Sequence, residues 1–190
     1  MLPNVVARGA LVVFVTLLIA EHAINSELSP GRHQISEYVH GDAGWTMTAA
    51  FVAWAVSLGA TAVDVGRWSR VAGILISVAA AGMLVTAGWA TQTSAGELPP
   101  GVSVTMAGRL HNLGSGAASA ALLAATIVSA AVGPTRWLRR AAIGLVSVAV
   151  ASDLLLLVVG ASVGGLRQRV LVLTAIAWQA VVLADRDRES

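Results

Sequence analysis

The chain has 190 residues, of which 56% are hydrophobic and only 12% are charged, and this composition excludes a protein built around a water-soluble core. Its net charge of +2 comes from twelve arginines scattered along a chain without lysine, so the charge gives no indication of nucleic-acid binding. Cysteine is absent, which excludes disulfides, thiolate nucleophiles and cysteine-ligated metals.

Six apolar segments separated by polar turns predict an all-α integral membrane protein, a single bundle of six transmembrane helices. The first segment resembles a signal peptide in that a basic residue, Arg8, precedes its apolar stretch. It runs into Glu21 and His22 with no small-residue cleavage pattern, so we interpret it as a helix. In chain order, the expected helices cover residues 5–24, 44–63, 71–90, 107–132, 141–160 and 165–184. Because each span needs about 20 residues, residues 1–190 are expected to form one transmembrane domain.

The longest polar interval is the predicted loop of residues 25–43, between the first two helices. It contains His33, Glu37, His40 and Asp42. No spacing such as H-E-x-x-H occurs among them, so the sequence does not predict a metal site. The loop is either a solvated segment or part of a site for ligand binding or acid–base chemistry.

The arginines predict the orientation in the membrane, because cytoplasmic loops carry an excess of basic residues. Eight arginines lie on one side of the six helices and four on the other. The first group comprises Arg8, Arg67, Arg70, Arg136, Arg139, Arg140, Arg186 and Arg188, and the second comprises Arg32, Arg109, Arg167 and Arg169. We therefore expect a multi-pass protein of the cytoplasmic (cell) membrane, with both termini in the cytoplasm and the loop of residues 25–43 outside.

Two acidic residues are expected inside the outer half of the bilayer. At 1.5 Å per residue, Asp153 lies about 20 Å beyond Arg140, and Glu21 lies equally far beyond Arg8. The last helix is short, so Arg169 is expected to be drawn below the outer boundary, where it can pair with Asp153. Asp153 then either forms a structural ion pair, with Arg169 or Arg109, or serves as a proton donor or substrate ligand.

Acids, histidines and arginines coincide in the loop of residues 25–43 and at the starts of the fourth and sixth helices, three segments expected on one side of the membrane. The candidate catalytic residues are Glu37, His111 and Asp153. The candidate substrate-binding residues are Glu21, His40, Arg109, Asn112, Gln168 and Arg169. No metal and no cofactor is expected, and haem ligation by His22 and His111 is disfavoured because both lie at helix ends.

Three motifs carry a resemblance to a known family: SPGRHQISEYVHGDAGW after the first helix, GRLHNLGSG at the start of the fourth and GLRQRVLV at the start of the sixth. With them the chain resembles, over about residues 8–184, the bacterial six-helix membrane family catalogued as domain of unknown function 998. The resemblance implies a helical bundle and no established activity. It implies characteristic positions at Ser36, Glu37, Gly108, His111, Gln168 and Arg169. Before the Gly-x-x-His element this chain has Glu97-Leu98-Pro99-Pro100, where family members often carry a Phe and an Asp.

Together these features favour a polar pocket on the extracytoplasmic side that binds or modifies a lipophilic or amphipathic small molecule, with membrane lipids around the bundle. In an enzyme version, Glu37, Glu21 or Asp153 is the general acid and His111 is the base. The alternative is a small proton-coupled transporter that uses Asp153 as its relay, for which a homodimer would compensate for the small size.

Because the chain lacks cysteine, single introduced cysteines test the orientation directly. The variants His40→Cys and Glu97→Cys are expected to react with a membrane-impermeant maleimide added to intact cells. The variants Arg67→Cys and Trp137→Cys are expected to react only after the membrane is permeabilised. Labelling of Arg67→Cys from outside would contradict the orientation.

Overall fold

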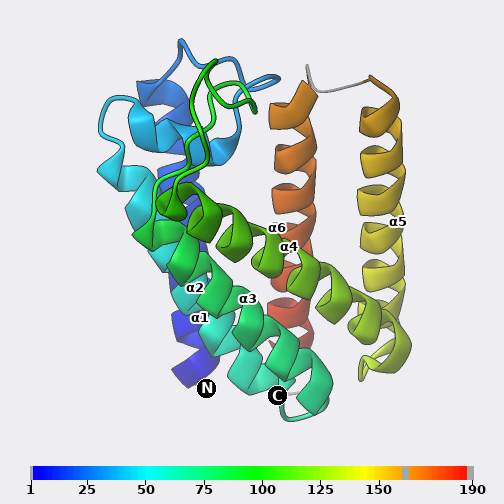
Figure 1. The fold of residues 1–190 in the computed structure, drawn as a ribbon. Helices are drawn as coiled ribbons and strands as arrows, with labels where there is room; N and C mark the ends of the chain where they lie inside the picture. The colour runs from blue at the N-terminus through cyan, green and yellow to red at the C-terminus, as the bar shows by residue number, and fades with distance from the viewer. Residues whose placement is uncertain (1, 160–162, 188–190) are drawn as a thin grey trace.

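The computed structural model describes residues 2–159 and 163–187, which form six long helices and one short 3-10 helix (Figure 1). The helices are α1 (Leu2–Ile24), η1 (Ile35–His40), α2 (Trp45–Val65), α3 (Arg70–Gly88), α4 (Met106–Val132), α5 (Arg136–Val159) and α6 (Gly164–Asp187). All six α-helices are long and apolar enough to cross a bilayer, which confirms the predicted class of an all-α membrane bundle.

Helices α1 to α5 pack in chain order, each against the next, and α6 packs on α5 with further contacts to α1, α2 and α4. Both termini lie at one end of the bundle, which we call the terminal end (Figure 1). Residues 25–44 and 89–105 cover the opposite end, which we call the loop end. Helix α4 crosses the bundle obliquely, so that it meets α5 near the terminal end and diverges from it toward the loop end.

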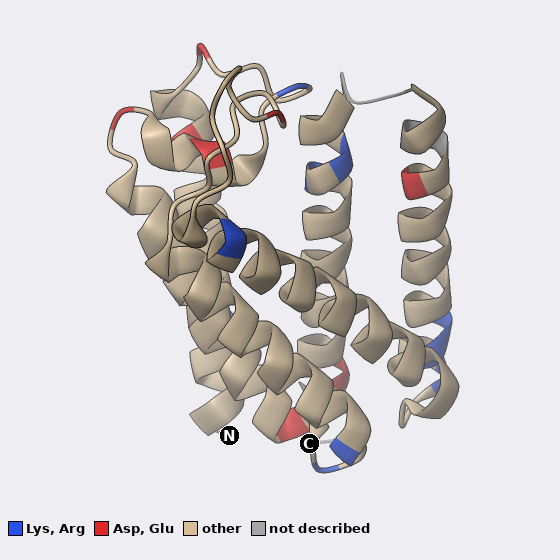
Figure 2. Cartoon of the chain, viewed as in Figure 1, with Lys and Arg blue, Asp and Glu red and all other residues tan. Residues whose placement is uncertain are grey.

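Charged residues gather at the two ends of the bundle, and the ribbon between them is almost free of charge (Figure 2). This distribution is the one a bilayer imposes, because an ionised side chain is costly at the centre of the hydrocarbon layer. Within the described residues, Asp153 in α5 and Arg167 in α6 are the charged residues that line a cavity between the helices.

Two glycines bring α3 and α4 into close contact. A Cβ atom at Gly82 would lie 2.6 Å from the carbonyl oxygen of Gly114, and one at Gly114 would lie 2.7 Å from the carbonyl oxygen of Gly82. Helices in lipid associate mainly through such van der Waals packing, because apolar side chains gain little by leaving lipid for protein. The small residues of α4 therefore fix its crossing with α3.

Buried hydrogen bonds hold α6 against α2 in the interior of the bundle. The fully buried Gln179 amide accepts from Trp54 Nε1 at 3.1 Å and donates to Ser57 Oγ at 2.7 Å and to Thr61 Oγ1 at 2.9 Å. Trp54 in turn stacks on Phe14 of α1, with ring centroids 4.6 Å apart. An amide left unpaired in hydrocarbon would cost several kcal/mol, so this network fixes the rotation of α6 about its own axis.

The glycine contact can be tested with one substitution and a control on the neighbouring helix. Gly82→Ala is expected to lower the free energy of unfolding by about 1–3 kcal/mol, because the added methyl group meets the α4 backbone. Gly116→Ala adds the same methyl group where no atom lies within 4 Å, so it should leave stability unchanged or raise it by up to about 1 kcal/mol. Thermal unfolding in detergent micelles measures both. Equal stability of the two variants would show that the close contact does not matter.

Candidate functional site

A cavity of about 330 Å³ lies inside the bundle, and side chains from all six α-helices and from η1 line it. Most of its wall is apolar, with the aromatic rings of Phe14, Phe51 and Trp54 on the side of α1 and α2. Its polar lining residues are Ser36, Thr86, Ser115, Ser119, Thr126, Asp153, Arg167, Gln168 and Thr174. The cavity is therefore an apolar space with a small number of polar groups.

The hydroxyls of Thr86, Thr126 and Thr174 are already satisfied, because each donates to a carbonyl four residues earlier in its own helix. The ionised and amide groups lie toward the loop end, in the last turns of α5 and the first turn of α6. They are Asp153, Arg167 and Gln168. The cavity thus has a polar region near the loop end and an apolar remainder.

Asp153 pairs with Arg167 across the α5–α6 contact. Arg167 donates through Nε to Asp153 Oδ1, and its Nη2 lies 3.0 Å from Asp153 Oδ2. The predicted pair of Asp153 with Arg169 is therefore wrong. Residues two apart on an α-helix are rotated by about 200° from each other, so only one of the two arginines can face α5. Rotation of α6 about its axis, which the count of residues along the helix does not give, decided the partner.

Arg169 instead faces the loop end of α1 and the loop of residues 25–44. Its Nη1 donates to the carbonyl oxygens of Pro30 at 2.7 Å, His33 at 2.6 Å and Gly165 at 3.1 Å. Its Nη2 donates to the Tyr38 hydroxyl at 2.9 Å. The guanidinium therefore holds the polar loop against α6, and its hydrogen bonds go to neutral groups among the described residues.

His22 and Tyr38 complete the surroundings of this guanidinium, and Tyr38 was not among the predicted site residues. Arg169 Nε donates to His22 Nε2 at 3.0 Å, which requires that nitrogen to be unprotonated. His22 Nδ1 then carries the hydrogen and donates to the Leu18 carbonyl oxygen at 2.7 Å. Burial raises the pKa of Tyr38 above its ordinary value, and the neighbouring Arg169 opposes this shift. The His22 imidazole and the Tyr38 hydroxyl thus both act as neutral acceptors for the arginine.

Glu37 is a candidate catalytic residue that the structure places in a backbone nest. Its carboxylate accepts from the N–H groups of Gln34 at 3.3 Å, Ala95 at 2.9 Å and Gly96 at 2.8 Å. Since Ala95 and Gly96 belong to the α3–α4 loop, Glu37 fastens that loop to η1. Glu37 is buried and does not line the cavity; it borders a separate surface groove between the two loops.

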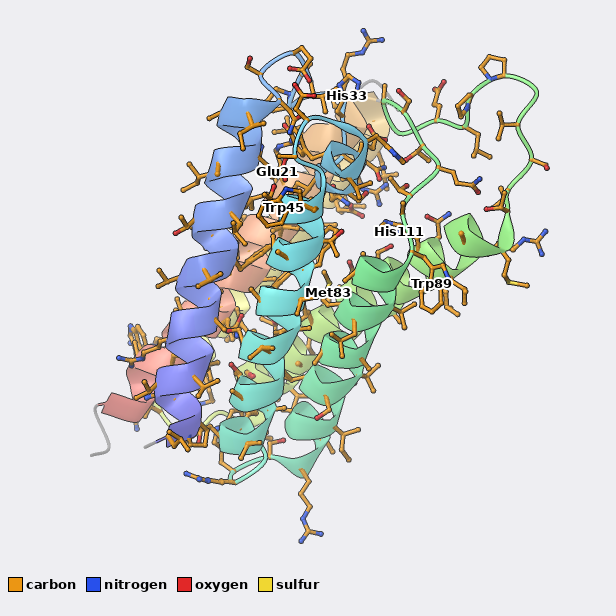
Figure 3. The ribbon with its side chains drawn as sticks, turned by 90° about the vertical axis from the view of Figure 1, so that its left-hand side faces the viewer. Glu21, His33, Trp45, Met83, Trp89 and His111 are labelled. Carbon is orange, nitrogen blue, oxygen red and sulfur yellow. The ribbon has the colours of Figure 1, made fainter. Side chains whose placement is uncertain are left out.

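Glu21 is fully buried at the loop end of α1, beside the start of α2 (Figure 3). One carboxylate oxygen lies 2.7 Å from Asn25 Nδ2, and the other is hydrogen-bonded to the Thr46 hydroxyl. Asn25 also donates to the Asp42 carbonyl oxygen at 3.2 Å. Glu21 therefore ties the beginning and the end of the loop to α1, outside the cavity.

The remaining candidate residues surround the loop end without meeting one another. His111 is buried, and its Nδ1 lies 2.7 Å from the carbonyl oxygen of Trp89 (Figure 3). His40 Nε2 lies 2.7 Å from the carbonyl oxygen of Thr91 and borders the surface groove with Glu37. Arg109 and Asn112 are exposed. Nowhere in residues 2–159 and 163–187 do three or more His, Asp or Glu side chains gather as metal ligands would.

The structure thus brings Asp153 and Gln168 to the cavity and uses several other candidates to build the loop end. Gln168 accepts a hydrogen bond from the Ile35 N–H, so it also anchors η1 over the cavity. Sequence reasoning missed Arg167 and Ser36 as lining residues. The sequence shows two arginines, Arg167 and Arg169, close together at the start of the sixth helix. It does not predict which of the two faces the interior of the bundle.

These features define a polytopic membrane protein with an internal, mostly apolar cavity. The sequence matches, over residues 9–185, the family described as "Protein of unknown function (DUF998)", and the chain belongs to this family. No curated protein and no solved structure matches the chain.

The role of Arg169 can be tested by replacing its guanidinium with the ammonium group of lysine. Arg169→Lys keeps the charge but removes the planar fork, and it is expected to cost about 2 kcal/mol of stability and to loosen the loop. Trypsin cleavage after the exposed Arg32 should become faster in this variant. Arg109→Lys, at an exposed position, is the control and should cleave at the wild-type rate. Wild-type cleavage of Arg169→Lys would show that the loop is held by other contacts.

Proposed function

We propose that this protein binds a lipophilic or amphipathic small molecule in the cavity. The apolar part of the ligand lies among the helices, and its polar part lies near Asp153, Arg167 and Gln168. The observation that carries this proposal is the division of one internal cavity into an apolar remainder and a polar region near the loop end. Ligand sites of proteins have this character, with mostly apolar walls and a few polar groups that fix orientation.

The volume supports the same conclusion. At about 330 Å³, the cavity is within the range of roughly 300–1,000 Å³ that small-molecule sites occupy. It far exceeds the occasional water-sized voids of a well-packed interior, so poor packing alone is a weak explanation.

Binding is favoured over proton transport by the surroundings of Asp153. Both of its carboxylate oxygens are hydrogen-bonded to Arg167, so a relay would first have to break this pair. The polar network deeper in the bundle consists of the amide of Gln179, the hydroxyls of Ser57 and Thr61 and the indole of Trp54, none of which transfers protons as an acid or base near neutral pH.

For the orientation we propose that the loop end faces outward. The arginines of α1 and of the α2–α3 and α4–α5 turns lie toward the terminal end, which the excess of basic residues assigns to the cytoplasm. The polar region of the cavity then lies in the outer half of the bilayer.

A cavity-filling substitution with a matched control tests the proposal. Ala149 is buried and lines the cavity, whereas Ala151, two residues further along α5, is exposed and does not. Energy transfer from tryptophan to a pyrene-labelled monoacylglycerol is expected to saturate with the wild-type protein, because Trp54 lines the cavity.

Ala149→Phe is expected to weaken this binding by at least about tenfold, or roughly 1.4 kcal/mol, because the new ring occupies ligand space. Ala151→Phe should leave the affinity unchanged. Energy transfer that does not saturate, or equal affinities of the two variants, would refute the proposed function.

A further inference from the structure

We infer that the ligand is a membrane phospholipid with a phosphoethanolamine-type head group, which enters the cavity sideways from the leaflet at the loop end, between α4 and α5. This inference rests on the proposed function and adds a route and a head-group class. One acyl chain occupies the cavity, and the head group meets the Asp153–Arg167 pair.

Exposure of the lining residues locates the opening. The lining residues of α1, α2 and α3 are buried. In contrast, Leu123 of α4 is 38% exposed, and Val150 and Leu154 of α5 are 44% and 60% exposed. Ser119 and Ala120 of α4 are exposed as well. The cavity therefore opens between α4 and α5, and we call these five residues the lateral portal.

The course of α4 explains why the portal faces the leaflet at the loop end. Near the terminal end α5 is closed against the bundle, where Leu138 and Ala142 are buried. Toward the loop end α4 runs away from α5 (Figure 1). The five residues of the lateral portal are apolar or small, as a passage for an acyl chain requires. None of these five residues is charged.

Within the described residues, η1 covers the cavity on the side of the loop end, which disfavours entry of a ligand from water there. Ile35 and Ser36 of η1 line the cavity and are each 2% exposed. The Ile35 N–H is hydrogen-bonded to Gln168, and Arg169 fixes the preceding residues through the His33 carbonyl oxygen. With this cover in place, the open route leads to lipid.

Charge complementarity selects the head group. A guanidinium has five N–H donors, and Arg167 directs two of them to Asp153, so three remain for a phosphate. Each carboxylate oxygen of Asp153 keeps a free lone pair for an ammonium N–H. The two side chains are 42% and 31% exposed, which leaves them accessible to a ligand.

A zwitterionic head group adds one charge of each sign to a pair that is already neutral. An anionic lipid would place an uncompensated negative charge beside Asp153, which is costly in a site partly withdrawn from water. A phosphocholine head group has no N–H to offer the carboxylate. We therefore expect phosphoethanolamine lipids to bind better than either.

Photoactivatable lipids test the route and the head group together. The protein is reconstituted in nanodiscs with phospholipids that carry a diazirine in one acyl chain and differ only in head group: phosphoethanolamine, phosphocholine or phosphoglycerol. After illumination, peptide mass spectrometry is expected to find adducts on the cavity-facing residues of α4 and α5. The yield for phosphoethanolamine should exceed that for phosphoglycerol by about tenfold.

Two variants and one control variant sharpen this result. Ala120→Trp narrows the lateral portal and should cut cavity adducts by about tenfold, whereas Ala131→Trp, exposed on the same helix but outside the lining, should not. Asp153→Asn removes the negative charge and should turn the preference toward phosphoglycerol. A destabilised variant would lower the adduct yields of all three head groups alike. The predicted effect of Asp153→Asn is instead a change in the ratio of these yields.

Equal yields for the three head groups, or adducts confined to the outward faces of the helices, would overturn this inference. If Ala149→Phe still blocks saturable binding of the pyrene-labelled monoacylglycerol, the proposed function stands and only the phospholipid assignment fails. If neither probe binds in the cavity, both fail.

Discussion

The guanidinium of Arg169 is the contact on which the loop end of this protein depends. Apolar side chains gain little by leaving lipid for protein, so helices in a bilayer need close packing or hydrogen bonds to associate. Arg169 supplies hydrogen bonds to α1, through His22, and to the polar loop, through Pro30, His33 and Tyr38. The same loop carries η1, which covers the cavity, so Arg169, together with Gln168 at the Ile35 N–H, determines where the cavity ends.

The cavity itself results from the way α6 is fastened. In the interior of the bundle Gln179 is hydrogen-bonded to α2. At the terminal end Arg8 donates to the Leu183 carbonyl oxygen at 2.6 Å, and Asp185 accepts from Thr135 at 2.6 Å. These directional contacts hold α6 beside the bundle. The apolar side chains of α6 therefore do not have to fill the space between α6 and the other helices. An apolar space can therefore persist between α6, α5 and the oblique α4. A soluble protein would lose stability through such a void, but in a bilayer a lipid chain can occupy it.

Much of the fold could be predicted from the sequence, because membrane spans are recognisable by their length and apolar composition. The position of Asp153 toward the loop end of its helix also followed from counting residues. Its partner did not, because hydropathy says nothing about the rotation of a helix about its axis, and Arg167 and Arg169 differ only in that rotation. The role of Glu37 was hidden for another reason. Its partners are backbone N–H groups of Ala95 and Gly96, which leave no trace in the identity of the side chains. Gln179 was overlooked because it stands in the apolar stretch of residues 175–184, with no charged residue beside it in the sequence.

The contact between Gly82 and Gly114 sets the dynamics of the bundle as well as its packing. With the backbones of α3 and α4 so close, α4 cannot tilt away from the portal without separating from α3. On the other side of the portal, the packing partners of α5 among the described residues are α4 and α6, and few of its described side chains are buried. The helix with more freedom to move is therefore α5, about its closed terminal end, and collective helix movements of this kind fall on the microsecond to millisecond scale. The residence time of a bound chain would be governed by the motion of one peripheral helix, while the rest of the bundle stays rigid.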